Sequence, residues 1–241
     1  MKLLPHVYQV GGPSRSHFFD ATVYLLPAGD EIVLIDCGTP EGFERIVENI
    51  RSLGFDPARI TRIYATHGHY DHTGAAKLFR EHFGTKLYIH PIDRAQVENG
   101  DSVLTSASLL YGVESEPTPV DGTFDEGDTF SVDAGNISIL HTPGHTQGGC
   151  CFILEHAQTG MRMLFAGDTL HGGFSDKIGS SEALWRESLG KLTAQHFDCM
   201  TFGHCPPSLL CDADERIRSL AQSFGNYYMP WFKDFYRKYP Y

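Results

Sequence analysis

The chain has 241 residues, of which 41% are hydrophobic and 20% are charged, and its formal net charge is −11. This length and apolar content are sufficient for a full core within one large domain. The 19 basic residues form no run, which argues against nucleic acid as a partner, and no apolar segment approaches the roughly 20 residues that span a membrane.

The six cysteines form no CxxC pair and no spacing typical of a small disulfide framework, which favours reduced thiols. Cys205, which follows a histidine, is expected to be structural like the others. The opening residues MKLLPH are interrupted by proline and polar side chains and do not form a signal-peptide core. We therefore expect a soluble, cytoplasmic protein.

The first part of the chain predicts a strand meander followed by one helix. Strands are predicted at 7–10, 21–26 and 31–36, the last two joined by the turn sequence Pro27-Ala28-Gly29-Asp30. Apolar residues then recur at helical intervals over 41–53, and the helix should stop at Gly54.

The segment ATHGHYDHTG, residues 65–74, places four possible metal ligands within six residues: His67, His69, Asp71 and His72. It lies between a predicted strand at 60–65 and a predicted helix at 75–83. Residues two apart in an extended chain face the same way, so His67 and His69 can hold one ion. The following turn would direct Asp71 and His72 to a second ion, and two metal positions are therefore implied.

The stretch 91–128, which follows a predicted strand at 86–90, is less regular. Helices are plausible at 92–99 and 103–111, and the stretch either covers the substrate or is an ordinary connector. His90 is expected to be structural. Further strands are predicted at 129–132, 137–141, 150–154, 161–165 and 199–203, and further helices at 181–192 and 216–224.

Half of the C-terminal segment 226–241 is aromatic, with a helical stripe formed by Tyr228, Trp231, Phe232, Phe235, Tyr236 and Tyr239. Such a stripe must be buried against another surface. Three surfaces are open: the rest of the domain, a partner subunit in a homodimer, or the rim of the metal cleft. We accordingly divide the chain into a catalytic domain, 1–225, and this segment, 226–241.

The segment 65–74 resembles the signature of the metallo-β-lactamase-fold hydrolase superfamily. Later segments are similar to the family's other motifs, in the same order: Thr142-Pro143-Gly144-His145-Thr146, Phe165-Ala166-Gly167-Asp168-Thr169 and Phe202-Gly203-His204. Near the start, Ile35-Asp36-Cys37-Gly38 is similar to the family's early buried aspartate. The resemblance covers about residues 5–210 and implies an α/β fold built as a four-layered αβ/βα sandwich.

The resemblance also implies a complete ligand set for two divalent metal ions. His67, His69 and His145 would hold one ion. Asp71, His72 and His204 would hold the other, and Asp168 would bridge them. Zinc is the expected metal, with iron or manganese as alternatives. True metallo-β-lactamases generally lack the bridging aspartate, so Asp168 favours the glyoxalase II-like, lactonase-like and phosphodiesterase branches.

The implied activity is that of a binuclear hydrolase in which a metal-bridging hydroxide attacks a small ester, thioester or lactone. Asp71 and His171 are the candidate catalytic residues. His171 would contact the substrate or protonate a leaving group, unless it is an exposed loop residue. Asp36 would fix the tautomer of a ligand histidine or the local backbone, unless it only forms a turn at a strand end.

Three alternative functions remain open. The first is a mononuclear iron dioxygenase that acts on persulfides, because that relative has much the same ligand set. The second is a phosphodiesterase or nuclease, against which the acidic charge and the missing tRNA-processing motifs argue. The third is a catalytically idle metal-binding sensor protein. Glyoxalase II proper is disfavoured, because its basic C-terminal helical domain is replaced here by a short aromatic tail.

Overall fold

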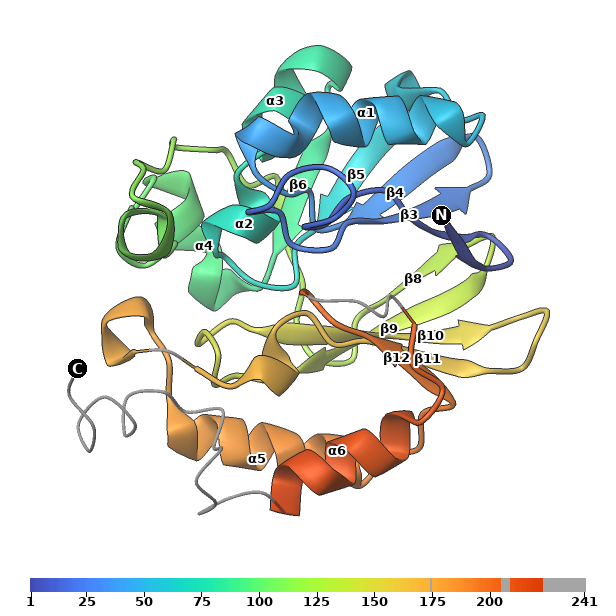
Figure 1. The fold of residues 1–241 in the computed structure, drawn as a ribbon, viewed down its shortest axis with the longest axis vertical. Coiled ribbons are helices and arrows are strands. Elements are labelled where there is room, and N and C mark those ends of the chain that lie inside the picture. The colour runs from blue at the N-terminus through green and yellow to red at the C-terminus, as the bar shows by residue number, and fades with distance from the viewer. Residues whose placement is uncertain (174, 205–208, 223–241) are drawn as a thin grey trace.

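In the computed structural model of the protein, two β-sheets lie face to face and helices cover their outer faces (Figure 1). The structure describes residues 1–173, 175–204 and 209–222. The predicted aromatic segment 226–241 and Cys205 lie outside the described residues. None of the helices in the described part of the chain has the length and apolarity needed to cross a membrane.

The first sheet begins as the predicted antiparallel meander and continues with parallel strands. In spatial order, its described strands are β1 (Lys2–Leu4), β2 (Val7–Gln9), β3 (Tyr24–Ala28), β4 (Glu31–Ile35), β5 (Ile60–Tyr64), β6 (Lys86–Ile89) and β7 (Gly122–Thr123). Strands β1 to β4 pair antiparallel, whereas β4 to β7 pair parallel. In the β3–β4 hairpin Ala28 pairs with Glu31, so the turn is only two residues long, with Gly29 at a φ of +63°.

The second sheet pairs antiparallel except at one edge. In spatial order, its described strands are β12 (Cys199–Thr201), β11 (Arg162–Phe165), β10 (Cys150–His156), β9 (Gly135–His141) and β8 (Thr129–Val132). Strands β11 and β12 are parallel. Since β10 is antiparallel to both β9 and β11, the strands β9, β11 and β12 all end at the same edge of the sheet.

The helices form the two outer layers. The first sheet is covered by α1 (Phe43–Ser52) and α3 (Ala76–Phe83), and the second by α5 (Glu182–Thr193) and α6 (Ala213–Gln222) (Figure 1). Two further helices, α2 (Tyr70–Thr73) and α4 (Pro91–Glu98), follow the ends of β5 and β6. This arrangement confirms the predicted four-layered αβ/βα sandwich.

Strands that are buried on both faces hold the layers together. In β4, Ile32 and Leu34 pack under α1 and α3, whereas Val33 and Ile35 pack between the sheets. Alternate residues of a strand point to opposite faces, so one short apolar run contributes to two cores. A third core, which contains the fully buried Trp185, lies between the second sheet and α5 and α6.

One predicted helix is wrong in its first half. Within 103–111, only Ala107–Tyr111 is helical, as a short π-helical turn. The carboxylate of Asp101 accepts the backbone N–H groups of Val103 and Leu104, and Ser106 adopts a left-handed φ of +63°. Both features favour turns over a continuous helix. The strands β1 and β7 were not predicted, because three and two residues are too few for a periodic signal.

Candidate metal centre

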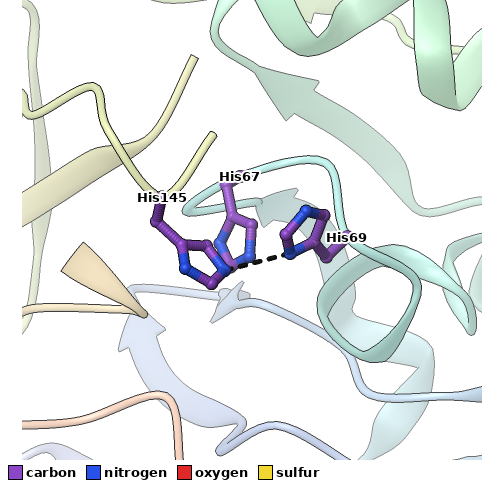
Figure 2. A group of neighbouring side chains, drawn as sticks. All are labelled: His67, His69 and His145. Atoms are coloured by element: carbon purple, nitrogen blue, oxygen red, sulfur yellow. Dashed lines mark hydrogen bonds between the residues drawn. The ribbon is translucent and has the colours of Figure 1, made fainter. Parts of the chain in front are cut away.

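The predicted ligand residues meet where the ends of the two sheets come together. His67 and His69 follow β5, and His145 follows β9 (Figure 2). The rings of His69 and His145 are in contact, with His69 Nδ1 3.0 Å from His145 Nε2. A backbone hydrogen bond from Cys150 N–H to the Thr66 carbonyl, 2.8 Å long, joins the two sheets beside them. The ends of strands from the two sheets thus bring together residues far apart in sequence.

Three groups of side chains have ligand atoms within 4.8 Å of one another. The groups are His67, His69 and His145; His67, His72 and Asp168; and Asp71, His72 and His204. The first and third groups coincide with the two ligand sets that the sequence resemblance implies. Asp168 Oδ2 lies 3.4 Å from His145 Nε2 and 3.2 Å from His204 Nε2, which places this carboxylate between the two sets.

The donor atoms fit a divalent cation. Among the described residues, the buried Nε2 atoms of His67, His69 and His72 and Oδ1 of Asp168 have no hydrogen-bond partner. A buried polar atom without a partner costs about 1–3 kcal/mol, so such a set requires an explanation. Imidazole nitrogens and carboxylate oxygens are ligands that zinc and similar ions accept. A bound cation would satisfy these atoms together.

The opposite ring nitrogens are held by groups that orient the imidazoles. His72 Nδ1 donates to Asp36 Oδ2 at 2.8 Å, and His145 Nδ1 donates to the Gly172 carbonyl at 2.5 Å. These contacts direct Nε2 of both rings into the centre. They also place Asp36 against His72, which is one of the predicted ligand histidines.

Asp36 holds the backbone beside the centre as well. Its carboxylate accepts the N–H of Thr66 at 2.7 Å and the Thr66 hydroxyl at 2.9 Å. Its own backbone has a φ of +57°, a left-handed conformation that is uncommon outside glycine. The strained turn at the end of β4 therefore delivers one carboxylate to both Thr66 and His72.

The first ligand set is electrically neutral. Burial lowers the pKa values of His67, His69 and His145 below that of a free histidine, in the case of His69 to about 3. Neighbouring histidines lower them further, because two adjacent imidazolium ions repel each other. At neutral pH these three rings are therefore uncharged.

The second ligand set is charged. Burial opposes protonation of His72 and His204, but the carboxylates around them outweigh burial and raise the pKa values to about 10 and 11. Burial alone would raise the pKa of Asp71, but His72 and His204 lower it to about 2. The same two histidines hold the pKa of Asp168 well below that of a free aspartic acid. Without metal, these four side chains form a buried ion-pair network.

His171 lies at the edge of the centre and is partly accessible. Its Nδ1 is 3.5 Å from Asp168 Oδ1, its ring stacks on Phe202, and 29% of its side chain is exposed. The structure thus places this candidate catalytic residue beside the predicted bridging carboxylate.

Asp93 is a supporting residue that the sequence did not reveal. It lies in the first turn of α4 and is buried. Its carboxylate accepts the N–H of Gly68 at 2.9 Å, the N–H of Gly148 at 2.8 Å and the hydroxyl of Thr146 at 2.7 Å. One side chain therefore fixes both loops that carry the first ligand set. The available signal for Asp93 in the sequence was an acidic residue shortly after a strand end. Acidic residues are also common in the first turn of ordinary helices, so this signal did not distinguish Asp93.

Tyr111 was also missed. Its hydroxyl group interacts with the Asp71 carboxylate, and burial together with that charge raises the pKa of the tyrosine. The residue stands in a segment whose conformation was predicted incorrectly, so no pattern connected it to the centre.

We expect Asp93→Asn to lower the free energy of unfolding by about 1–3 kcal/mol and to weaken metal binding roughly 10- to 100-fold. The amide keeps one acceptor oxygen but presents an N–H₂ group to donors. Denaturant unfolding and competition with a chromophoric chelator measure the two effects. Asp133→Asn is the matched control, because Asp133 accepts one backbone N–H at the surface. Equal behaviour of both variants would contradict the role given to Asp93.

Comparisons with known proteins agree with this geometry. A family model described as the metallo-beta-lactamase superfamily matches residues 18–204. The chain is 27% identical over 201 residues to the "Probable metallo-hydrolase YqgX" of Bacillus subtilis, and the match covers 81% of this chain and 90% of that protein. It is 30% identical over 174 residues to an atrochrysone carboxyl ACP thioesterase of Aspergillus fumigatus, covering 70% of this chain and 47% of that protein.

An uncharacterized protein of Aquifex aeolicus is 34% identical to this chain over 143 residues. The match covers 59% of this chain and 61% of that protein. The Aquifex and Aspergillus relatives are thus matched over less than two thirds of their own length. Among solved structures, BJP-1, a subclass B3 metallo-beta-lactamase of Bradyrhizobium japonicum, has the same fold, with a TM-score of 0.75 at 21% identity, covering 93% of this chain and 91% of that one. The family model spans most of the chain, which therefore belongs to the metallo-β-lactamase superfamily.

Proposed function

We propose that this protein is a binuclear hydrolase of small esters, thioesters or lactones. Membership of the superfamily and the relative named a metallo-hydrolase support the coarser statement, a metal-dependent hydrolase. The binuclear proposal depends on one observation: two ligand groups, each with three members, lie on either side of Asp168. Two divalent cations held there would acidify a water molecule and polarise the carbonyl of the substrate.

Each side chain of the centre has a distinct part in this proposal. His67, His69 and His145 supply three neutral nitrogens to one side, and Asp71, His72 and His204 supply the other. The negative charge of Asp168 reduces the repulsion between two nearby cations. Asp71 is ionised at neutral pH, because its pKa is about 2, so its carboxylate serves as a ligand and as an acceptor that orients the attacking water.

His171 is proposed as the group that donates a proton to the leaving oxygen or sulfur. It is partly exposed, unlike the ligand histidines of the first set, so substrate can approach it.

A carbonyl substrate is favoured over a phosphodiester. The net charge of −11 disfavours a polyanionic substrate, and the thioesterase among the relatives lends support to thioester chemistry. A panel of thioester, lactone, carboxyl ester, phosphodiester and β-lactam substrates tests the proposal. We expect the first three to be hydrolysed. Exclusive phosphodiester turnover, or oxygen consumption with a persulfide and one iron per chain, would contradict it.

We expect His145→Ala to reduce hydrolysis at least about 10²-fold, because the substitution removes one nitrogen from the first ligand set while leaving β9 in place. Steady-state kinetics and circular dichroism on metal-loaded protein measure activity and folding separately. His82→Ala on the exposed face of α3 is the control. Normal turnover by the His145 variant would rule out the assigned centre.

The two ligand sets should release different numbers of protons when metal binds. At neutral pH the first set is neutral, whereas His72 and His204, with pKa values of about 10 and 11, each hold a proton that metal must displace. Raised pKa values mean that protons compete with metal below pH 10, so affinity of the second set should rise with pH, by up to about 10²-fold per unit.

Calorimetric titration of metal-free protein in two buffers of different ionisation enthalpy counts these protons. We expect one binding event that releases almost none and another that releases about two. Equal proton release from both events would show that the charge difference between the two sets is wrong.

We expect His171→Gln to lower kcat for alkyl esters by about 10²-fold while metal content stays unchanged, because a general acid contributes roughly that factor. The effect should be much smaller for 4-nitrophenyl esters, whose leaving group needs no proton. Paired kinetics on the two ester types check this. A loss of the same size on both types would assign His171 a structural role instead.

A further inference from the structure

Two segments distant in sequence are attached to the two sides of Asp71. The backbone N–H of Tyr70 donates to the Thr105 carbonyl at 2.8 Å, which fixes the segment that ends at Tyr111. The N–H of Ala21 donates to the Asp71 carbonyl at 3.2 Å, which fixes the segment that precedes β3. Both segments lie beside α2 (Figure 1). They therefore border the metal centre.

Aromatic rings connect the two segments and extend outward from the centre. Tyr111 lies against the Asp71 carboxylate, the ring of Phe19 packs edge-on against Tyr111 with centroids 5.2 Å apart, and Phe18 follows Phe19 at 5.8 Å. The series runs from a proposed metal ligand to the protein surface.

The outer part of this series is unusually exposed for apolar side chains. Phe18 is 79% exposed, and Leu109 and Leu110, which precede Tyr111, are 53% and 43% exposed. We call Phe18, Phe19, Leu109, Leu110 and Tyr111 the apolar wall. The exposed side chains lie on the two segments that the Phe19–Tyr111 contact joins, and grouped exposed apolar residues mark a binding surface more often than isolated ones do.

The backbone holds the leucines of the wall in this position. The π-helical turn that carries them lies between Ser106 and Gly112, both with left-handed φ values, +63° and +68°. The Ser108 N–H donates to the Ser102 carbonyl at 2.8 Å, which closes the turn on itself. A non-glycine residue in a left-handed conformation carries strain, and such strain is found where a segment serves a function.

We propose that the apolar wall binds the acyl chain of the substrate, so that the preferred substrates are esters or thioesters of medium-length aliphatic acids. The occupant follows from position, because the wall is continuous with Asp71 and a chain lying on it would have its carbonyl end at the metal centre. The claim about hydrolysis depends on the proposed function, whereas the claim about binding of an aliphatic chain does not.

Hydrolysis of a series of 4-nitrophenyl esters from acetyl to octanoyl tests the first claim. We expect kcat/KM to rise about tenfold over the series, since each methylene removed from water favours binding and the wall covers only one side of the chain. The double variant Phe18→Ser, Leu109→Ser should flatten the series to within about twofold. Ile92→Ser is the matched control, because Ile92 is 55% exposed and lies on α4.

Binding of octanoate and acetate to the metal-loaded full chain, measured by calorimetry, tests the second claim without catalysis. We expect octanoate to bind about tenfold more tightly than acetate, and the double variant to lose this margin. Suppose that no ester is hydrolysed but the double variant loses the preference for octanoate over acetate. The proposed function is then wrong, and the binding of an aliphatic chain by the apolar wall is supported. If octanoate binds no more tightly than acetate, or if the double variant keeps the preference for octanoate, the claim that the apolar wall binds an aliphatic chain is contradicted, whatever the hydrolysis results.

Discussion

Five imidazole rings and two carboxylates lie together at the junction of the two sheets, and burial leaves several of their atoms without hydrogen-bond partners among the described residues. Each such atom costs free energy that a bound cation would recover. The surrounding fold keeps these atoms in place: strand ends deliver them, and Asp36 and Asp93 fix the loops between. The two apolar cores that flank the first sheet hold β4 and β5 rigidly enough for a strained turn to persist at Asp36.

The two sides of the centre differ in charge, and the difference arises from the placement of carboxylates. His72 touches Asp36, Asp71 and Asp168, whereas His67 and His69 face mainly other histidines. The second set is therefore held in ion pairs, whereas the rings of the first set are neutral. On this basis we expect the first set to bind a metal ion more readily than the second set in mildly acidic solution.

Much of the centre could be predicted because its residues occur as local motifs. The pattern over 65–74, together with His145, Asp168 and His204, combines residue types that few other sites require, and the strands that carry them have strong apolar periodicity. The four-layered sandwich followed from resemblance, not from periodicity. Asp93 and Tyr111 could not be predicted, because an isolated aspartate or tyrosine has no distinctive spacing, and both act through contacts made only in three dimensions.

The segment 103–111 shows the corresponding limit for secondary structure. Its leucines and tyrosine have helical spacing, but the backbone hydrogen bonds that the Asp101 carboxylate accepts and the left-handed Ser106 outweigh that preference. The result is a turn that presents Leu109 and Leu110 to solvent beside the centre instead of burying them. The competition between helix formation and such local hydrogen bonds depends on single side chains, so the periodicity of apolar residues does not reveal it.

Metal content is the measurement that most directly tests the central claim. Purified protein, reloaded with zinc in excess and freed of unbound metal, should contain two ions per chain by elemental analysis, and Asp168→Asn should retain about one. A wild-type protein that holds a single ion under the same conditions, or an Asp168 variant that keeps two, would contradict the binuclear centre.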